Sequence, residues 1–328
     1  MVHFFQSLTI FFLLFTHLCQ GLDFQKRVET EKIISRTPME EVLRKKGHIA
    51  HFTSTVVIVE LESGTKAVLK PVSRYLSYMA IAEVAAYRAS LFLNLNLVPT
   101  TVLFDKDGVQ GSLQAYIEPS FDLMIKGKYE TIKGKISPED LANIQLFYFV
   151  FGQWDPGLSN FIAVEEGDRV HLYLIDNAAI GYRQKVRYGE HPFVFCFPDL
   201  VLPINPNEGP FPFDHPSSLP PEIEAWRTEL GGYLTEEEIR EKLCRLKWKP
   251  VIYAIWEGGF WRQYGFWQPA YTEFYPPETM KKLQSLTLDH LKKFFHNDWG
   301  YEFSPEYFDD ILERRDQVVK AWQKHLSN

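Results

Sequence analysis

Apolar and polar positions divide the chain into a strand-rich first part and a helix-rich remainder. Short runs of β-branched and aromatic residues predict strands at residues 56–62, 67–70, 100–104 and 112–118. A longer apolar run at residues 79–95 predicts a helix, in a stretch whose charged residues are Glu83 and Arg88. We therefore expect residues 22 to about 119 to form a small sheet with one buried helix.

The second part of the chain begins near Pro119, and local sequence signals predict where its first helix and a β-hairpin lie. Ser137 followed by Pro138 predicts a helix N-terminus, from which an apolar run leads to Phe151. Residues 161–164 and 170–175, with a Gly-centred turn between them, predict a β-hairpin. The remainder is predicted to be helical, and its aromatic-rich stretch at residues 256–271 suggests a core between helices or, alternatively, a ligand platform.

Three polar side chains are predicted to converge at one end of this hairpin. If the hairpin is centred on Asp168, Asn160 lies opposite Asp176, because both are eight residues from the centre. Asp155 precedes the same end in a Pro-Gly loop. Such residues often do no more than cap loops and bond backbone donors. Taken together, their oxygens also suit a hard divalent cation such as Mg²⁺.

Two further charged residues fall where apolar neighbours predict burial. Lys70 ends the strand KAVLKP, and Glu83 lies on the buried helix. An unpaired internal charge costs several kcal/mol or shifts its pKa until the group is neutral. We therefore expect Lys70 and Glu83 to pair, which would also aim the ammonium group at a ligand phosphate.

The N-terminus and the composition restrict the class of protein. The apolar run Leu8–Leu18 followed by small residues at Cys19 and Gly21 predicts a secretory signal peptide cleaved after Gly21. A retained membrane anchor and a lipoprotein linked through Cys19 are the alternatives. Cleavage would leave Cys196 and Cys244, which allow at most one disulfide. The net charge of −7 argues against a nucleic-acid-binding protein.

The order Lys, Glu, Asp-x4-Asn, Asp resembles the protein-kinase-like superfamily. The likeness is to its atypical branch, which contains phosphatidylinositol 3/4-kinases, HipA-type kinases, and the secretory-pathway Golgi casein kinase and four-jointed kinases. The resemblance implies an α+β, two-lobed protein-kinase-like fold. Residues 1–21 would be the signal peptide, residues 22–119 a β-rich N-lobe, and residues 120–328 a mainly helical C-lobe.

The resemblance also implies a role for each of these residues. Residues 47–55 would form the phosphate-covering loop, whose hydroxyl residues are Thr53, Ser54 and Thr55. The lysine would bind the ATP phosphates, and the glutamate would hold it. Asp155 would be the catalytic-loop aspartate, and Asn160 and Asp176 would bind the metal. Asn177 stands where ordinary protein kinases have Phe, and Asp155 is followed by Pro-Gly instead of the residues common in relatives.

The implied activity is an ATP-dependent kinase that moves the γ-phosphate to a hydroxyl group of a protein or lipid, with phosphoinositides among the acceptors. The implied cofactors are ATP and Mg²⁺ or Mn²⁺. Three alternatives stay open: a nucleotide-binding pseudokinase, an enzyme that transfers AMP to a protein, and a structural protein without a nucleotide. The leader predicts export through the secretory route, to the exterior, the periplasm or a secretory lumen, and the activity does not require a membrane.

Overall fold

The computed structural model describes residues 21–45, 55–72, 76–121, 131–153, 160–178, 180, 253–257, 260–264 and 274–327. The chain divides into two compact units. The first comprises Met1–Glu118, Tyr173–Ala178 and Thr287–Ser304, and the second comprises Pro119–Leu172, Ala179–Leu286 and Pro305–Asn328. Both units combine antiparallel strands with helices, and the predicted α+β class is confirmed.

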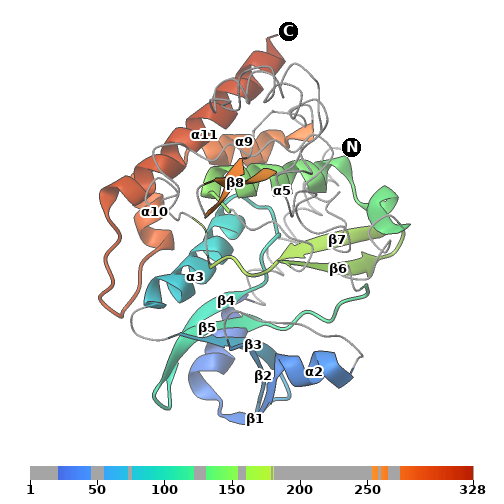
Figure 1. The fold of residues 1–328 in the computed structure, drawn as a ribbon, viewed down its shortest axis with the longest axis vertical. Coiled ribbons are helices and arrows are strands. Elements are labelled where there is room, and N and C mark those ends of the chain that lie inside the picture. Colours follow the sequence, from blue (N-terminus) through green and yellow to red (C-terminus); the bar gives the residue numbers. More distant parts are fainter. Residues whose placement is uncertain are drawn as a thin grey trace, which may run out of the picture. The chain divides into compact units, whose positions relative to one another are not determined.

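The first unit is built on a five-stranded antiparallel sheet with the strand order β1-β2-β3-β5-β4 (Figure 1). Its strands are β1 (Ile33–Pro38), β2 (Val57–Leu61), β3 (Lys66–Pro71), β4 (Thr101–Lys106) and β5 (Val109–Ala115). The four strands predicted from the sequence are confirmed as β2 to β5. The edge strand β1, the short helix α2 (Met39–Lys45) and a helix over residues 21–30 were not predicted.

The helix of residues 21–30 covers one face of this sheet. Its Phe24 and Val28 are buried against apolar side chains of the strands, among them Ala67 and Leu69 of β3. Successive residues of a strand point to opposite faces. Since Ala67 and Leu69 point into this core, the alternation turns Lys70 toward the other face.

A glycine fixes how closely β5 approaches the end of β3. Gly111 pairs with Pro71 across the two strands. A β-carbon at this position would collide with the backbone carbonyl of Lys70 and lie 2.9 Å from the Cα of Pro71. The strand contact that holds the backbone of Lys70 therefore requires glycine here.

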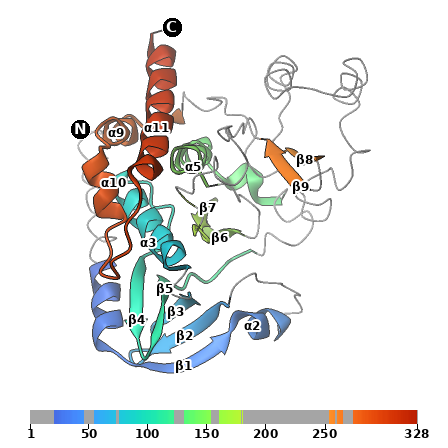
Figure 2. The ribbon, with the colours of Figure 1, turned by 60° about the vertical axis from the view of Figure 1, so that its left-hand side comes forward.

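The buried helix of the prediction is α3 (Ser77–Phe92), which contacts β4 and β5. It begins two residues before the predicted start and ends three before the predicted end. Asn94 adopts a left-handed conformation with φ 57°, so the helix cannot continue through it. Helix α10 (Leu288–Phe294) belongs to the same unit and lies beside α3 in both views (Figures 1 and 2).

The second unit contains the helices α5 (Pro138–Phe151), α9 (Pro277–Gln284) and α11 (Pro305–Leu326), and α11 contacts both others (Figure 2). The predicted start of α5 is confirmed, because the Ser137 side chain accepts a hydrogen bond from the backbone N–H of Asp140. Helix α11 likewise begins at a proline, Pro305, whose fixed φ suits the first helical position. Arg314 of α11 donates from Nε to the carbonyl oxygen of Val150 at 3.0 Å, which joins α11 to the end of α5.

The described residues also form two β-hairpins outside the five-stranded sheet, both between α5 and α9 in the sequence. The predicted one is confirmed as β6 (Phe161–Glu166) and β7 (Arg169–Leu174), although only Gly167 and Asp168 separate the strands. The expectation of helices around residues 253–264 is wrong. There β8 (Tyr253–Glu257) and β9 (Phe260–Tyr264) pair as antiparallel strands. The sequences YAIWE and FWRQY are rich in aromatic residues, which favour strands, and this explains the correction.

The predictions for the N-terminal leader and for Cys196 and Cys244 lie outside the described residues. Within the described part of the chain, every helix is too short or too polar to cross a membrane.

Candidate active site

Lys70 and Glu83 form a buried ion pair in the first unit. The ammonium nitrogen of Lys70 lies 2.5 Å from Oε1 of Glu83, and the two side chains are 15% and 2% exposed. The pair joins the end of β3 to the middle of α3. This is the geometry that the burial of both charges predicted, whereas the catalytic role of the pair stays a prediction.

Asp176 joins the pair from a distant part of the chain. Its Oδ1 lies 3.0 Å from the Lys70 ammonium nitrogen, so the lysine is held between two carboxylates. The second carboxylate oxygen of Glu83, Oε2, accepts the backbone N–H of Asn177 at 3.0 Å. Glu83 thus binds both the lysine and the backbone next to Asp176. These four residues form what we call the Lys70 cluster.

Burial and neighbouring charges together shift the pKa values of Lys70 and Glu83. Burial alone would lower the pKa of Lys70, but the negative charges of Glu83 and Asp176 outweigh it and the pKa is raised. Burial raises the pKa of Glu83, and the charge of Asp176 raises it further, against the opposing effects of Lys70 and the Asn177 N–H. Lys70 is therefore a firmly held cation, and its positive charge opposes the rise that burial causes in the pKa of Glu83.

Asp176 differs from Glu83 in its access to solvent. Its side chain is 52% exposed, so it can reach a ligand as well as Lys70. Its backbone is left-handed, with φ 58°. Asp tolerates this conformation better than most residues, and such backbone outliers gather at functional sites.

The local chain path explains how Asp176 and Asn177 are placed. Strand β7 ends at Leu174, whose N–H donates to the carbonyl oxygen of Leu97 at 2.7 Å. The side-chain amide nitrogen of Asn177, Nδ2, in turn donates to the Leu174 carbonyl oxygen at 3.2 Å. The Asn177 Oδ1 is buried and has no hydrogen-bond partner among the described residues. The turn after β7 is thus fastened to the first unit on both sides of Asp176.

Two of the other predicted site residues fall within the described part of the chain. Thr55 is exposed just before β2, and Asn160 is buried just before β6. Asn160 belongs to the second unit, whereas Asp176 belongs to the first, so their shared metal site stays a prediction. Asp155, Thr53 and Ser54 lie outside the described residues.

The donor set of the Lys70 cluster suits a metal ion that brings most of its own ligands. In the described part of the chain, no group of three or more His, Cys, Asp or Glu residues could hold an ion by itself. Mg²⁺ is commonly bound by one or two carboxylates together with water and substrate phosphates. The half-exposed carboxylate of Asp176 fits that requirement.

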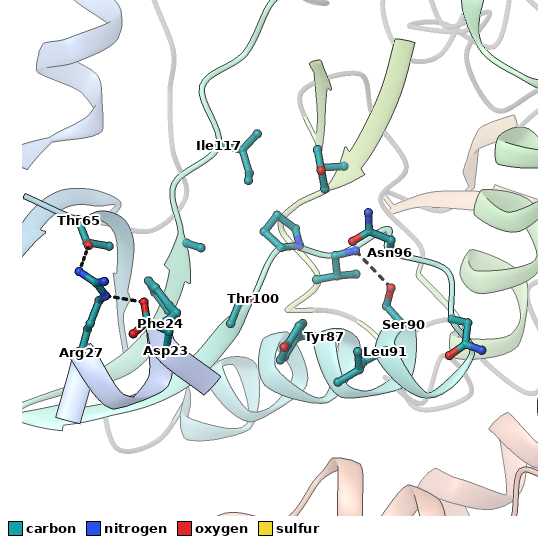
Figure 3. A pocket seen from close by; sticks show the side chains of 15 residues that line it. Asp23, Phe24, Arg27, Thr65, Tyr87, Ser90, Leu91, Asn96, Thr100 and Ile117 are labelled. Atoms are coloured by element: carbon teal, nitrogen blue, oxygen red, sulfur yellow. Dashed lines mark hydrogen bonds and ion pairs between the residues drawn. The ribbon is translucent and has the colours of Figure 1, made fainter. Parts of the chain in front are cut away.

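A pocket of about 420 Å³ in the first unit lies away from this cluster, since Lys70, Glu83 and Asp176 are absent from its lining (Figure 3). The helix of residues 21–30 forms one wall, where Arg27 donates to Asp23 at 2.7 Å and contacts Thr65. Helix α3 forms another wall through Tyr87, Ser90 and Leu91. The lining combines polar and apolar side chains, and the Arg27 guanidinium at its edge is already paired with the Asp23 carboxylate.

The sequence prediction missed the contacts of two residues, one in the site and one on the far side of the helix that carries Glu83. Asn177 was noted for its position and not for its backbone N–H, which binds Glu83. Arg88 is the second charged residue on α3, and a lone arginine on a buried helix signals that acceptors must be near. It donates to backbone carbonyls of α10 and of the residues after it.

No protein-family model matches the chain, and no curated protein sequence matches it. Among solved structures, a crystal structure of the golgi casein kinase is similar, with a TM-score of 0.41 and 10% sequence identity. The match covers 92% of this chain and 76% of that chain.

Proposed function

We propose that the protein is an ATP-dependent phosphotransferase of the atypical kinase type. The observation that supports this most is the Lys70 ammonium group, held at 2.5 Å from Glu83 and at 3.0 Å from Asp176. A lysine that only stabilised the fold would need one buried carboxylate. Here a second, half-exposed carboxylate stands beside it, and a cation next to an accessible carboxylate is the arrangement that binding of a metal–phosphate complex would need.

Phosphoryl transfer needs positioning and charge neutralisation more than covalent catalysis. In our proposal, Lys70 binds phosphate oxygens of ATP while Glu83 keeps its ammonium group in place. Asp176, with Asn160 as the expected second ligand, holds Mg²⁺ or Mn²⁺, which neutralises phosphate charge when bound. Asp155 orients the acceptor hydroxyl and accepts its proton.

The acceptor and the compartment belong to the same proposal. The acceptor is a hydroxyl group of a protein or a phosphoinositide, and neither nucleic acid nor a membrane is required. The predicted leader supports action in the secretory route, where the enzyme needs an exported supply of ATP.

The first test is calorimetry with ATP, in the presence of Mg²⁺ or of a chelator. We expect Asp176→Asn to reduce Mg²⁺-dependent binding at least tenfold, because the substitution removes the charge that attracts the metal. Asp107→Asn is a matched control, since Asp107 is also left-handed, with φ 54°, and belongs to the same unit but not to the cluster. Equal binding by wild type and Asp176→Asn would refute the metal role.

A labelling experiment separates the alternatives. The purified protein is incubated with ATP carrying the label in the γ- or the α-phosphate, against protein and phosphoinositide panels. Transfer of the γ-label supports a kinase, and transfer of the α-label identifies AMP transfer instead. Binding without transfer of either label identifies a pseudokinase, and no binding at all rejects a nucleotide function.

A further inference from the structure

A segment far along the chain lies against α3, the helix that carries Glu83. Residues Thr287–Ser304 belong to the first unit although the chain on both sides of them belongs to the second. The rings of Tyr78 and Tyr301 approach to 6.4 Å between centroids near the start of α3. Near its end, the ring of Phe92 lies 5.4 Å from that of Phe294. The segment therefore follows α3 over most of its length.

These contacts lie on one side of α3, opposite Glu83. An α-helix turns by about 100° per residue. Tyr78, Arg88 and Phe92 therefore lie within about 80° of one another around the helix axis. The middle of that stripe is roughly 180° from Glu83. The segment thus contacts the back of α3, while the front presents the carboxylate to Lys70.

Arg88 is the polar link between the segment and α3. Its half-buried guanidinium donates from Nη1 to the carbonyl oxygens of Phe294 and His296, both at 2.8 Å, and of Lys293 at 3.3 Å. The last carbonyls of a helix lack intrahelical donors and carry a partial negative charge. Arg88 satisfies these carbonyls at the end of α10, so α3 cannot move from α10 without exposing them.

We propose that Thr287–Ser304 acts as a clamp that positions α3, and that Arg88 is its main positioning residue. A shift of α3 away from the sheet would withdraw Glu83 from both Lys70 and the Asn177 N–H. The state of the clamp therefore sets whether Lys70 is held for a ligand. Its effect on catalysis rests on the proposed phosphotransferase function, whereas its effect on Lys70 itself does not.

The test measures the acylation rate of individual lysines by mass spectrometry, which requires no nucleotide. Lys70 reacts slowly while its ammonium group is largely buried and held by two carboxylates, because the reagent must reach the nitrogen atom. In Arg88→Ala we expect acylation of Lys70 to rise about tenfold, which corresponds to an opening free energy about 1.4 kcal/mol lower. Lys106, which bonds the carbonyl oxygen of Glu29 in the same unit, is the internal reference and should not change. Arg36→Ala, on the outer strand β1, is the matched control variant.

Each outcome decides the proposal. A selective rise at Lys70 in Arg88→Ala, with partial recovery in Arg88→Lys, supports the clamp, because lysine can still reach a carbonyl. An unchanged Lys70 rate in a folded Arg88→Ala protein overturns it, and so does an equal rise at Lys106, which indicates general loosening. If Arg88→Ala does not fold, Arg88→Lys and Tyr301→Ala replace it, and unchanged Lys70 rates in both overturn the proposal. Wild-type protein that binds no Mg²⁺–ATP refutes the phosphotransferase function, while the Lys70 rates still judge the clamp.

Discussion

Replacing Lys70 by Met leaves the carboxylate of Glu83 buried without its cation. The methionine keeps the apolar stem of lysine, so lost packing contributes little to the effect. Removing one partner of a buried ion pair typically costs about 3–5 kcal/mol. Glu83 is 2% exposed and falls in this class, whereas Asp176 is 52% exposed and can be hydrated instead. We therefore expect the free energy of unfolding to fall by about 3 kcal/mol at pH 7.

The double variant Lys70→Met/Glu83→Gln should recover more than half of this loss. Glutamine is neutral, so no charge is left buried, and its amide oxygen can still accept the Asn177 N–H. Lys66→Met is the control, because Lys66 is exposed at the start of the same strand. Its effect on the free energy of unfolding should stay within about 0.5 kcal/mol.

The difference between the single and double variants should depend on pH. Burial already raises the pKa of Glu83, and loss of Lys70 raises it further. A carboxyl group whose folded pKa exceeds its unfolded value of about 4.3 binds more protons when folded. The stability of Lys70→Met relative to the double variant should therefore fall as pH rises from about 4, by up to roughly 1.4 kcal/mol per pH unit, until the folded pKa is reached.

Urea unfolding followed by circular dichroism between pH 4 and pH 8 measures both effects. Near pH 4 the carboxyl group is mostly protonated in both the folded and the unfolded state, and the stabilities of the two variants should differ least. A double variant no more stable than Lys70→Met at pH 7 would refute the reasoning. So would a difference between the two that does not change with pH.

Two further predictions concern the second unit and use the same unfolding assay. Gly152 and Gly167 share a φ of +66°, but a β-carbon at Gly152 would lie 2.9 Å from the Arg314 guanidinium, whereas Gly167 has open space. Gly167→Ala should cost about 1 kcal/mol for the left-handed backbone, and Gly152→Ala about 1–3 kcal/mol more, since Arg314 must move; equal costs would contradict the contact. Ser137→Ala should lose about 1 kcal/mol with the cap to the Asp140 N–H, whereas Ser137→Asp should retain it. A loss as large in Ser137→Asp would show that the cap is not the cause.

Elements whose signals are local could be predicted from the sequence. The Ser137-Pro138 start of α5 is an example, because an N-cap and its acceptor geometry involve residues three apart. The helix of residues 21–30 could not be predicted in the same way. Its buried side chains Phe24 and Val28 are too few to mark an amphipathic helix, and their burial depends on a sheet face formed by later strands.

The hairpin of β8 and β9 shows the limit of pattern reading in aromatic stretches. The prediction treated Trp256 and its neighbours as a core between helices. Trp256 pairs with Trp261 across the two strands instead. Aromatic residues are common both in helix cores and on strands, so their density alone does not distinguish the two.

One contact of the candidate site could be predicted from the sequence, and another could not. The Lys70–Glu83 pair was predictable, because a buried charge needs a partner whatever the fold. The contact of Lys70 with Asp176 joins residues 106 positions apart, and no local pattern indicates it. The hairpin register predicted only that Asp176 lies opposite Asn160. The contact of Asp176 with Lys70 depends on the path of the chain after β7, which the hydrogen bond from Leu174 to Leu97 helps to set.

The charge balance of the Lys70 cluster indicates in which form a nucleotide would bind. One ammonium group and two carboxylates leave the cluster with a net negative charge when all three are ionised. Glu83 is fully buried and occupied by Lys70 and the Asn177 N–H, so the negative charge that a ligand could reach resides on the half-exposed Asp176. The phosphates of a free nucleotide would be repelled by that carboxylate. A divalent cation reverses the sign of the interaction, because it binds the carboxylate and the phosphates at once. If a nucleotide binds beside Lys70, as proposed, the arrangement of these three charges favours its metal complex over the nucleotide alone.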